Sequence, residues 1–290
     1  MLRGAGGEPV DFRRTLASHG VASLPPARID EEAWTLEVTL PSPRRAHTVR
    51  VSELRPGVAL VEGVRSGTLE QLRHMLRLDE DLSRFYELAR RDPDLAWAAD
   101  GAGRMLRSPT VFEDVVKTIC TTNCAWSGTV RMVTALVDHL GEPAAGGGRA
   151  FPSPAAMGEA DAGFYRDVAR AGYRGAYLQS LAEQVSSGAL DLEELNDRGL
   201  PDVEVEARLL ALPGVGPYAA AHVMLTSLGR YSRLVLDSWT RPTYAKLSGR
   251  KATDVAIARR FRRYGEFAGL AFWLRLTRGW VPDPEPRPAA

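Results

Sequence analysis

The stretch LPGVGPY (212–218) lies between two apolar segments that we expect to be helical. Gly214 and Gly216 permit the positive φ angles of a tight hairpin, because glycine has no Cβ. Pro217 suits the first turn of the second helix, where its missing N–H costs nothing. The free amides of the hairpin and of that helix N-terminus would form a site for an anion. The sequence therefore predicts a helix-hairpin-helix motif that holds a backbone phosphate of DNA; a glycine-closed corner without a ligand is the alternative.

A single carboxylate follows the hairpin in a basic part of the chain. The apolar run 234–236 ends at Asp237, which is 21 positions after Gly216. Between positions 230 and 263 there are ten basic residues and two acidic ones, Asp237 and Asp254. Such a local excess of positive charge is typical of a surface that binds phosphates, although the net charge of the chain is only +1. A solvated helix face explains the charge equally well, and Asp237 could simply cap a helix.

This combination resembles the helix-hairpin-helix/Gly-Pro-Asp superfamily of base-excision DNA glycosylases. The match falls on Gly214, Val215, Gly216 and Asp237. Four other segments are similar to such enzymes in the same order: RLDEDLSRFY (77–86), MLRSPTVFEDVVKTIC (105–120), AGYRGAYL (171–178) and YGEFAGLAFWL (264–274). The resemblance covers nearly the whole chain. It is nearest the 8-oxoguanine DNA glycosylase branch, with the 3-methyladenine DNA glycosylase II branch next.

The residue patterns and the resemblance together predict an α+β fold. Period-2 alternation predicts strands at 34–40, around Val49 and Val51, and at 58–61, which belong to an antiparallel β domain at 1–75. A mostly helical glycosylase core is expected at 76–280, with the helix-hairpin-helix at about 205–228. Ser108-Pro109 is expected to open one helix. Further helices are expected at 130–140, 154–168, 177–185, 205–212 and 217–228, and a disordered tail at 281–290.

The resemblance implies roles for individual residues. Asp237 is expected to be the catalytic carboxylate, which stabilises an oxocarbenium-like sugar and orients water after the base has been flipped out. Asn123, with Thr122, is the candidate wedge that fills the gap; a helix-capping role for Asn123 is the alternative. The expected DNA-backbone contacts are Gly214, Val215, Gly216 and Arg241.

The expected base pocket contains Tyr218, His222 and Phe272. Tyr218 and His222 are one helical turn apart, so they share a face. His222 could equally be an ordinary buried histidine. Phe272 falls where 8-oxoguanine glycosylases place a glutamine that reads the base, and a phenyl ring cannot make that hydrogen bond, which argues against strict 8-oxoguanine specificity.

The resemblance also limits the reaction. Bifunctional relatives carry a nucleophilic lysine two positions after the second hairpin glycine, where this chain has Tyr218. Without an amine no Schiff base forms, so we expect a monofunctional hydrolase without β-lyase activity. An aromatic pocket favours an alkylated base. An oxidised-purine (8-oxoguanine-type) glycosylase and a catalytically inactive damaged-DNA-binding protein are the alternatives; a nuclease or lyase would need an amine or a metal cluster near the hairpin.

Composition bounds the rest. The two cysteines, Cys120 and Cys124, are too few for a disulfide framework or an iron–sulfur cluster, and we expect both to be buried in one helix. We therefore expect no metal and no cofactor. No long apolar run or secretory signal is present, so the expectation is a cytoplasmic monomer, associated with the nucleoid in a bacterium, whose partner is double-stranded DNA with a damaged base.

Overall fold

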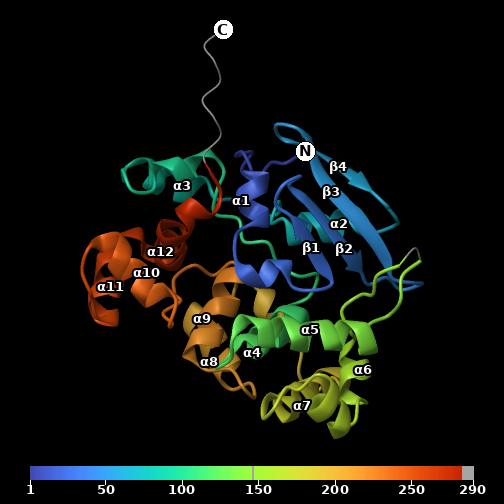
Figure 1. Ribbon diagram of the computed structural model, residues 1–290. Coiled ribbons are helices and arrows are strands. Elements are labelled where there is room, and N and C mark those ends of the chain that lie inside the picture. Colours follow the sequence, from blue (N-terminus) through green and yellow to red (C-terminus); the bar gives the residue numbers. More distant parts are fainter. Residues whose placement is uncertain (146, 283–290) are drawn as a thin grey trace.

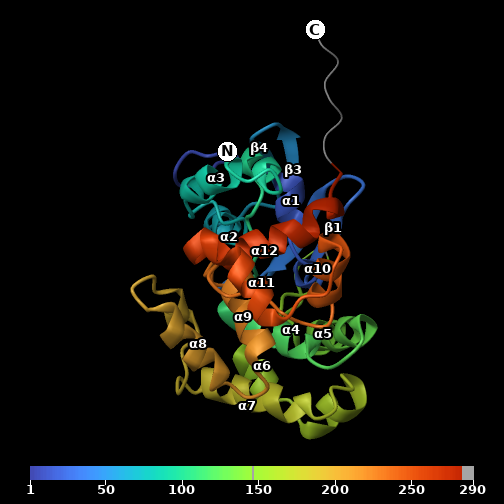
Figure 2. The same ribbon diagram turned by 90° about the vertical axis from the view of Figure 1, so that its left-hand side faces the viewer.

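The computed structural model describes residues 1–145 and 147–282. Three large hydrophobic clusters divide this part of the chain into a sheet unit and two groups of helices, which lie side by side in Figures 1 and 2. The predicted α+β class, with a helical core and a small antiparallel sheet, is confirmed.

The sheet unit is built from the N-terminal part of the chain. Its antiparallel strands follow the order β1-β2-β3-β4, at Ala27–Asp30, Thr35–Leu40, His47–Arg55 and Val58–Glu62. Alternate residues of β2 and β3, such as Leu36 and Val51, share one apolar core with α1 (Phe12–Leu16) and α2 (Thr68–Met75). A short 3-10 helix, η1 (Gly20–Ser23), leads into β1. The three predicted strands are present; β1, which is short, was not predicted.

The first helical cluster forms the lower part of Figure 1. It contains α4 (Val111–Thr121), α5 (Trp126–Leu140), α6 (Pro154–Gly158), α7 (Arg174–Ser186), α8 (Asp202–Leu210) and α9 (Pro217–Thr226). Two short elements complete it, the π-helical turn η3 (Phe164–Val168) and the 3-10 helix η4 (Glu193–Asn196).

The second helical cluster joins distant parts of the sequence. It combines α3 (Ser83–Arg90) and η2 (Ala96–Asp100) with α10 (Thr240–Ser248), α11 (Asp254–Phe261), η5 (Arg262–Phe267) and α12 (Ala268–Thr277). The short η6 (Arg278–Trp280) follows α12. Residues of α9 pack on both clusters, and Tyr218 contacts each of them.

Two predicted helix boundaries were wrong. Ser108-Pro109 does not open α4; Thr110 is its N-cap, since the Thr110 hydroxyl accepts the Glu113 amide at 3.2 Å. The single helix predicted over 154–168 is broken after Gly158 and resumes only as η3.

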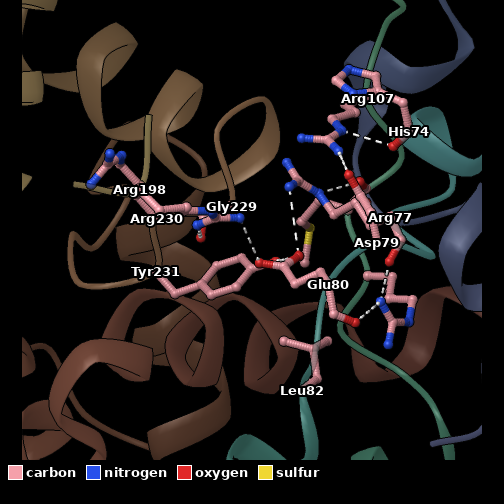
Figure 3. Close-up of polar contacts among 12 residues, drawn as sticks. His74, Arg77, Asp79, Glu80, Leu82, Arg107, Arg198, Gly229, Arg230 and Tyr231 are labelled. Carbon is pink, nitrogen blue, oxygen red and sulfur yellow. Dashed lines mark hydrogen bonds and ion pairs between the residues drawn. The ribbon is translucent and has the colours of Figure 1, made fainter. Parts of the chain in front are cut away.

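A buried polar network ties the sheet unit to both groups of helices (Figure 3). Glu80 accepts a hydrogen bond from the Tyr231 hydroxyl at 2.6 Å and pairs with Arg198 at 3.2 Å. Arg77 is fully buried and donates to the carbonyl groups of Met105 and Thr226. The network holds the end of α9, and therefore the connection toward α10, in a fixed place.

The predicted domain division at 75/76 stays a prediction, and the core of the sheet unit also includes Leu76, Leu78 and Leu106. Most of the tail predicted at 281–290 lies outside the described residues, which end at 282. No helix in the described ranges is long and apolar enough to cross a membrane.

Candidate active site

The two glycines of the hairpin between α8 and α9 have different backbone conformations. Gly214 has φ +79°, and a Cβ there would lie 2.8 Å from a ring carbon of Tyr177, so only glycine fits without strain. Gly216 is extended, with φ −102°, and caps α9; a Cβ there would meet nothing within 4 Å. The expectation of positive φ is therefore right for Gly214 and wrong for Gly216, which faces open space.

The three hairpin amides that we expected to bind phosphate are not equally free to donate a hydrogen bond. The amides of Gly214 and Gly216 have no acceptor within the part of the chain that the structure describes. The Val215 amide donates to Leu212 O at 3.2 Å, and its side chain is buried. Val215 is thus a structural part of the turn, and its amide is not free for DNA as predicted.

Asp237 lies at the entrance to α10. Its Oδ1 accepts the amides of Trp239 at 2.9 Å and Thr240 at 2.6 Å, while the Thr240 hydroxyl accepts the Asp237 amide at 2.8 Å. This reciprocal arrangement is a capping box. Oδ2 has no hydrogen-bond partner among the described residues, and the residue is half-buried. Asp237 therefore caps the helix and still presents one carboxylate oxygen.

That oxygen belongs to a residue lining an open cleft of about 700 Å³. The cleft lies between the hairpin, the end of α4 and the start of α10, where the two helical clusters meet. Asp237 and Arg241 line one side, and the hairpin and the loop after α4 line the others through Gly214, Gly216, Tyr218, Thr122 and Asn123. The structure thus brings most of the predicted site residues together around one cleft.

Tyr218 occupies the position where the resemblance leads us to expect lysine in a bifunctional enzyme. Its hydroxyl lies 3.2 Å from the Thr121 hydroxyl at the end of α4. Burial raises the pKa of Tyr218, and the negative charge of Asp237 raises it further. The phenol therefore stays protonated at neutral pH.

The predicted wedge loop is held in an unusual conformation. Asn123 is exposed and has φ +47°, a region that asparagine tolerates better than most residues. The guanidinium group of the buried Arg174 donates to Thr122 O, with Nε at 2.9 Å. Asn123 Nδ2 donates to the Tyr173 hydroxyl at 3.2 Å. Thr122 is the C-cap of α4 and Asn123 follows it, so the polar tip projects into the cleft region from a fixed base.

Two predicted pocket residues do not line the cleft. Phe272 is fully buried in the second helical cluster, with its ring centroid 5.2 Å from that of Phe261. His222 is also buried, behind Tyr218, with Nδ1 3.4 Å from the hydroxyls of Thr118 and Thr226. Burial lowers the pKa of His222 to about 3, so it is neutral. Both are core residues, because α4 packs against α9 at His222 and because α10 and α11 pack against α12 at Phe272.

Arg241 lines the cleft as predicted and also makes a bidentate ion pair with Asp254, at 2.8 and 2.9 Å. Four further residues line the cleft that were not predicted from the sequence: Thr121, Tyr173, Tyr177 and Cys124. Cys124 is exposed, since α4 ends before it, and only Cys120 is buried as predicted. The exposed aromatic residues in AGYRGAYL were the one available signal for Tyr173 and Tyr177. In the described ranges no three His, Cys, Asp or Glu residues are grouped so as to hold a metal ion.

Comparisons with solved structures place this fold. The Archaeoglobus fulgidus 3-methyladenine DNA glycosylase matches with a TM-score of 0.75 and 20% identity, over 94% of this chain and 96% of that one. MBOgg1, solved with a low-affinity DNA ligand, matches with a TM-score of 0.75 and 22% identity over 94% of both chains. The Clostridium acetobutylicum 8-oxoguanine glycosylase/lyase, solved with double-stranded DNA containing cytosine opposite 8-oxoguanine, gives 0.73 and 20%, over 94% and 93%.

The chain therefore has the fold of the helix-hairpin-helix DNA glycosylases, and the resemblance predicted from its sequence is confirmed, with both named branches among the neighbours. Among curated proteins, N-glycosylase/DNA lyase OGG1 of Arabidopsis thaliana is 30% identical over 206 residues, which are 64% of this chain and 54% of that protein. The chain thus matches about half the length of this relative. No protein-family model matches the chain.

Proposed function

We propose that the protein is a DNA glycosylase that removes a damaged base from duplex DNA by hydrolysing its N-glycosidic bond. The observation that carries the proposal is the position of Asp237, which lines the same cleft as Gly214 and Gly216 and has one carboxylate oxygen without a hydrogen-bond partner among the described residues. An ionised carboxylate beside a deoxyribose stabilises the cation that forms as the base departs.

The hairpin supplies the grip on DNA. The amides of Gly214 and Gly216 are available, and the bare surface of Gly216 lets a phosphate approach the N-terminus of α9. Arg241 lines the same cleft and would exchange Asp254 for a second phosphate. The proposed site needs no group from a second chain, so one copy of the protein suffices for it. We keep the expectation of a monomer in the cytoplasm, associated with the nucleoid in a bacterium.

The flipped nucleotide leaves a gap in the duplex, and we assign Asn123 to fill it. Extrusion costs a few kcal/mol, so the enzyme needs a group that holds the duplex open. Asn123 is exposed at the tip of a loop whose base is fixed by Arg174, and Thr122 supports it.

Hydrolysis then needs one carboxylate and one water. The C1′–N bond breaks, and its electron pair leaves with the base. Water oxygen bonds to C1′ and passes one proton to the Asp237 carboxylate. An alkylated purine is already cationic and departs as a neutral base, so this route needs no separate acid.

We propose that strand cleavage does not follow. Tyr218 has no amine, and Lys117 is buried in an ion pair with Glu113 at 2.7 Å. Lys246 and Lys251 do not line the cleft. We therefore expect no Schiff base with the sugar at this site. Borohydride trapping on processed duplex tests this directly. We expect no covalent adduct, although the Arabidopsis relative is named a lyase. An adduct would refute the proposal that strand cleavage does not follow.

The cleft favours alkylated bases. Tyr173, Tyr177 and Tyr218 line it, and aromatic faces bind cations. Oxidised purines are the second candidate, because the curated relative and two of the solved neighbours bear 8-oxoguanine or OGG1 names. Phe272 is buried and does not line the cleft, so it does not count against this candidate.

A panel of duplexes, each with a single lesion, decides between these substrates. We expect release of N7-methylguanine or 3-methyladenine and little release of 8-oxoguanine. Release of 8-oxoguanine alone would favour the second candidate, and tight binding without release of any base would leave an inactive damaged-DNA-binding protein.

A further inference from the structure

The hydroxyl groups at the end of α4 fix the direction of the hydrogen bond that Tyr218 makes. Thr121 Oγ1 lies 2.6 Å from Thr118 O and 3.2 Å from Tyr218 Oη. A threonine hydroxyl has one proton to give. The carbonyl oxygen can only accept, and it is much the nearer of the two, so the Thr121 proton goes to Thr118.

The helix end explains why that carbonyl needs the proton. In a continuing helix the Thr122 amide would donate to Thr118 O, but here it turns back and donates to Ile119 O at 3.2 Å. The last carbonyl groups of a helix lack backbone donors, and threonine side chains often supply them. The Thr121 proton is therefore committed, and Thr121 can only accept from Tyr218.

We call the two hydrogen bonds from Tyr218 to Thr121 and from Thr121 to the Thr118 carbonyl the relay. The relay leaves one lone pair of the Tyr218 hydroxyl oxygen free to accept a hydrogen bond. Its own proton is donated to Thr121, so the remaining lone pair of Oη is what the tyrosine offers at the cleft wall that it forms. The unpaired Oδ2 of Asp237, on the same cleft, is also an acceptor. Tyr218 and Asp237 therefore line the same cleft, and each has an acceptor that no described residue occupies.

We propose that Tyr218 is a catalytic residue. Together with Asp237 it accepts hydrogen bonds from the two hydrogens of the attacking water, so that the lone pair of the water oxygen points toward C1′. The inference rests on the proposed glycosylase function and adds a second acceptor to it. In the reaction, the hydrogen bonded to Asp237 transfers as the C1′–O bond forms; the one bonded to Tyr218 stays on the product hydroxyl.

A site with two acceptors should prefer water to an alcohol as the nucleophile. Methanol has one O–H and can satisfy only one of the two acceptors, so the wild-type site should disfavour it. Without the Tyr218 oxygen, water and methanol meet one acceptor each and become equivalent.

The test uses the full-length protein and a duplex with one N7-methylguanine, in single-turnover reactions with and without methanol. Tyr218→Phe should lower the rate of base release about tenfold, the value of one hydrogen bond. The ratio of methyl glycoside to abasic product should rise by a similar factor. The affinity of Tyr218→Phe for the same duplex with an uncleavable 2′-fluorinated nucleotide should equal that of the wild type. An unchanged product ratio, with or without a loss of rate, would overturn the proposal, because a stacking or packing role alone does not alter that ratio.

A second pair of variants tests the relay. Thr121→Val removes the acceptor and should slow release by freeing the Tyr218 proton, and Thr121→Ser should recover most of that loss. A further readout does not require activity: in 1:1 H₂O/D₂O, the Cζ carbon of Tyr218 should give two resolved NMR signals from a slowly exchanging hydroxyl, and these should merge in Thr121→Val. One averaged signal in the wild type would refute the relay, whereas a wild type that releases no base would refute the proposed function.

Discussion

Asp237 and Thr240 cap each other at the start of α10, with the carboxylate accepting the Thr240 amide at 2.6 Å and the Thr240 hydroxyl accepting the Asp237 amide at 2.8 Å. Asparagine also caps helices well. Asp237→Asn should therefore keep the free energy of unfolding within about 0.5 kcal/mol of the wild type, while Asp237→Ala should lose about 1 kcal/mol. Urea unfolding measures both, and equal stability of the alanine variant would show that the cap contributes nothing.

The two hairpin glycines should respond differently to alanine. Gly214→Ala places a Cβ against Tyr177 at a positive φ and should cost about 1–2 kcal/mol of stability from backbone strain alone. Gly216→Ala meets open space in an extended conformation, so the fold should tolerate it.

For Gly216→Ala the loss should appear in DNA binding, because the new methyl group would lie where we propose that the phosphate approaches. Unfolding and duplex-binding measurements on both variants check the pair. A Gly216→Ala variant that binds DNA as tightly as the wild type would remove this glycine from the interface.

The two cysteines should differ in reactivity. Burial raises the pKa of the Cys120 thiol to about 12, whereas Cys124 is exposed on the cleft. A maleimide should therefore label one thiol per chain and block duplex binding, and Cys124→Ser should prevent both effects. Mass spectrometry locates the label; modification of Cys124 without any loss of binding would mean that DNA does not occupy this side of the cleft.

Buried neutral histidines should make the fold sensitive to acid. His222 has its pKa lowered to about 3 by burial, with the charge of His19 acting in the same direction. The unfolded chain then binds a proton below about pH 6.5 that the folded chain does not, so stability falls as pH falls. His222 alone accounts for about 1.4 kcal/mol per pH unit between pH 6 and 4.

Urea unfolding at pH 7.5, 6.0 and 5.0 measures this slope. His222→Gln should flatten it without abolishing it, since burial also lowers the pKa of His19 and of His74 to about 4. An identical slope in the variant would place the proton uptake elsewhere.

Local patterns predicted those parts of the molecule that depend on local chemistry. The LPGVGPY turn, the β2–β4 alternation and the aspartate after an apolar run all mark structures formed by neighbouring residues. Helical spacing placed Tyr218 and His222 on one face correctly, since their rings lie 5.8 Å apart.

Spacing within one helix does not reveal what the other helices cover. His222 and Phe272 were expected in a pocket but lie in the core, because α4 packs against His222 while α10 and α11 pack against Phe272, which only the assembled fold determines. The same applies to Thr121 and Tyr218, whose contact joins α4 to α9 across 97 positions of sequence.

The central claim is that the negative charge of Asp237 drives base release, and Asp237→Asn tests it most directly. Its single-turnover rate on the best duplex of the lesion panel is compared with that of Asp81→Asn, another aspartate that accepts a backbone amide but lies outside the cleft. We predict that Asp237→Asn releases the base at least about 100-fold more slowly than the wild type while it folds and binds the duplex, and that Asp81→Asn behaves as the wild type. Base release by Asp237→Asn at the wild-type rate would contradict the account.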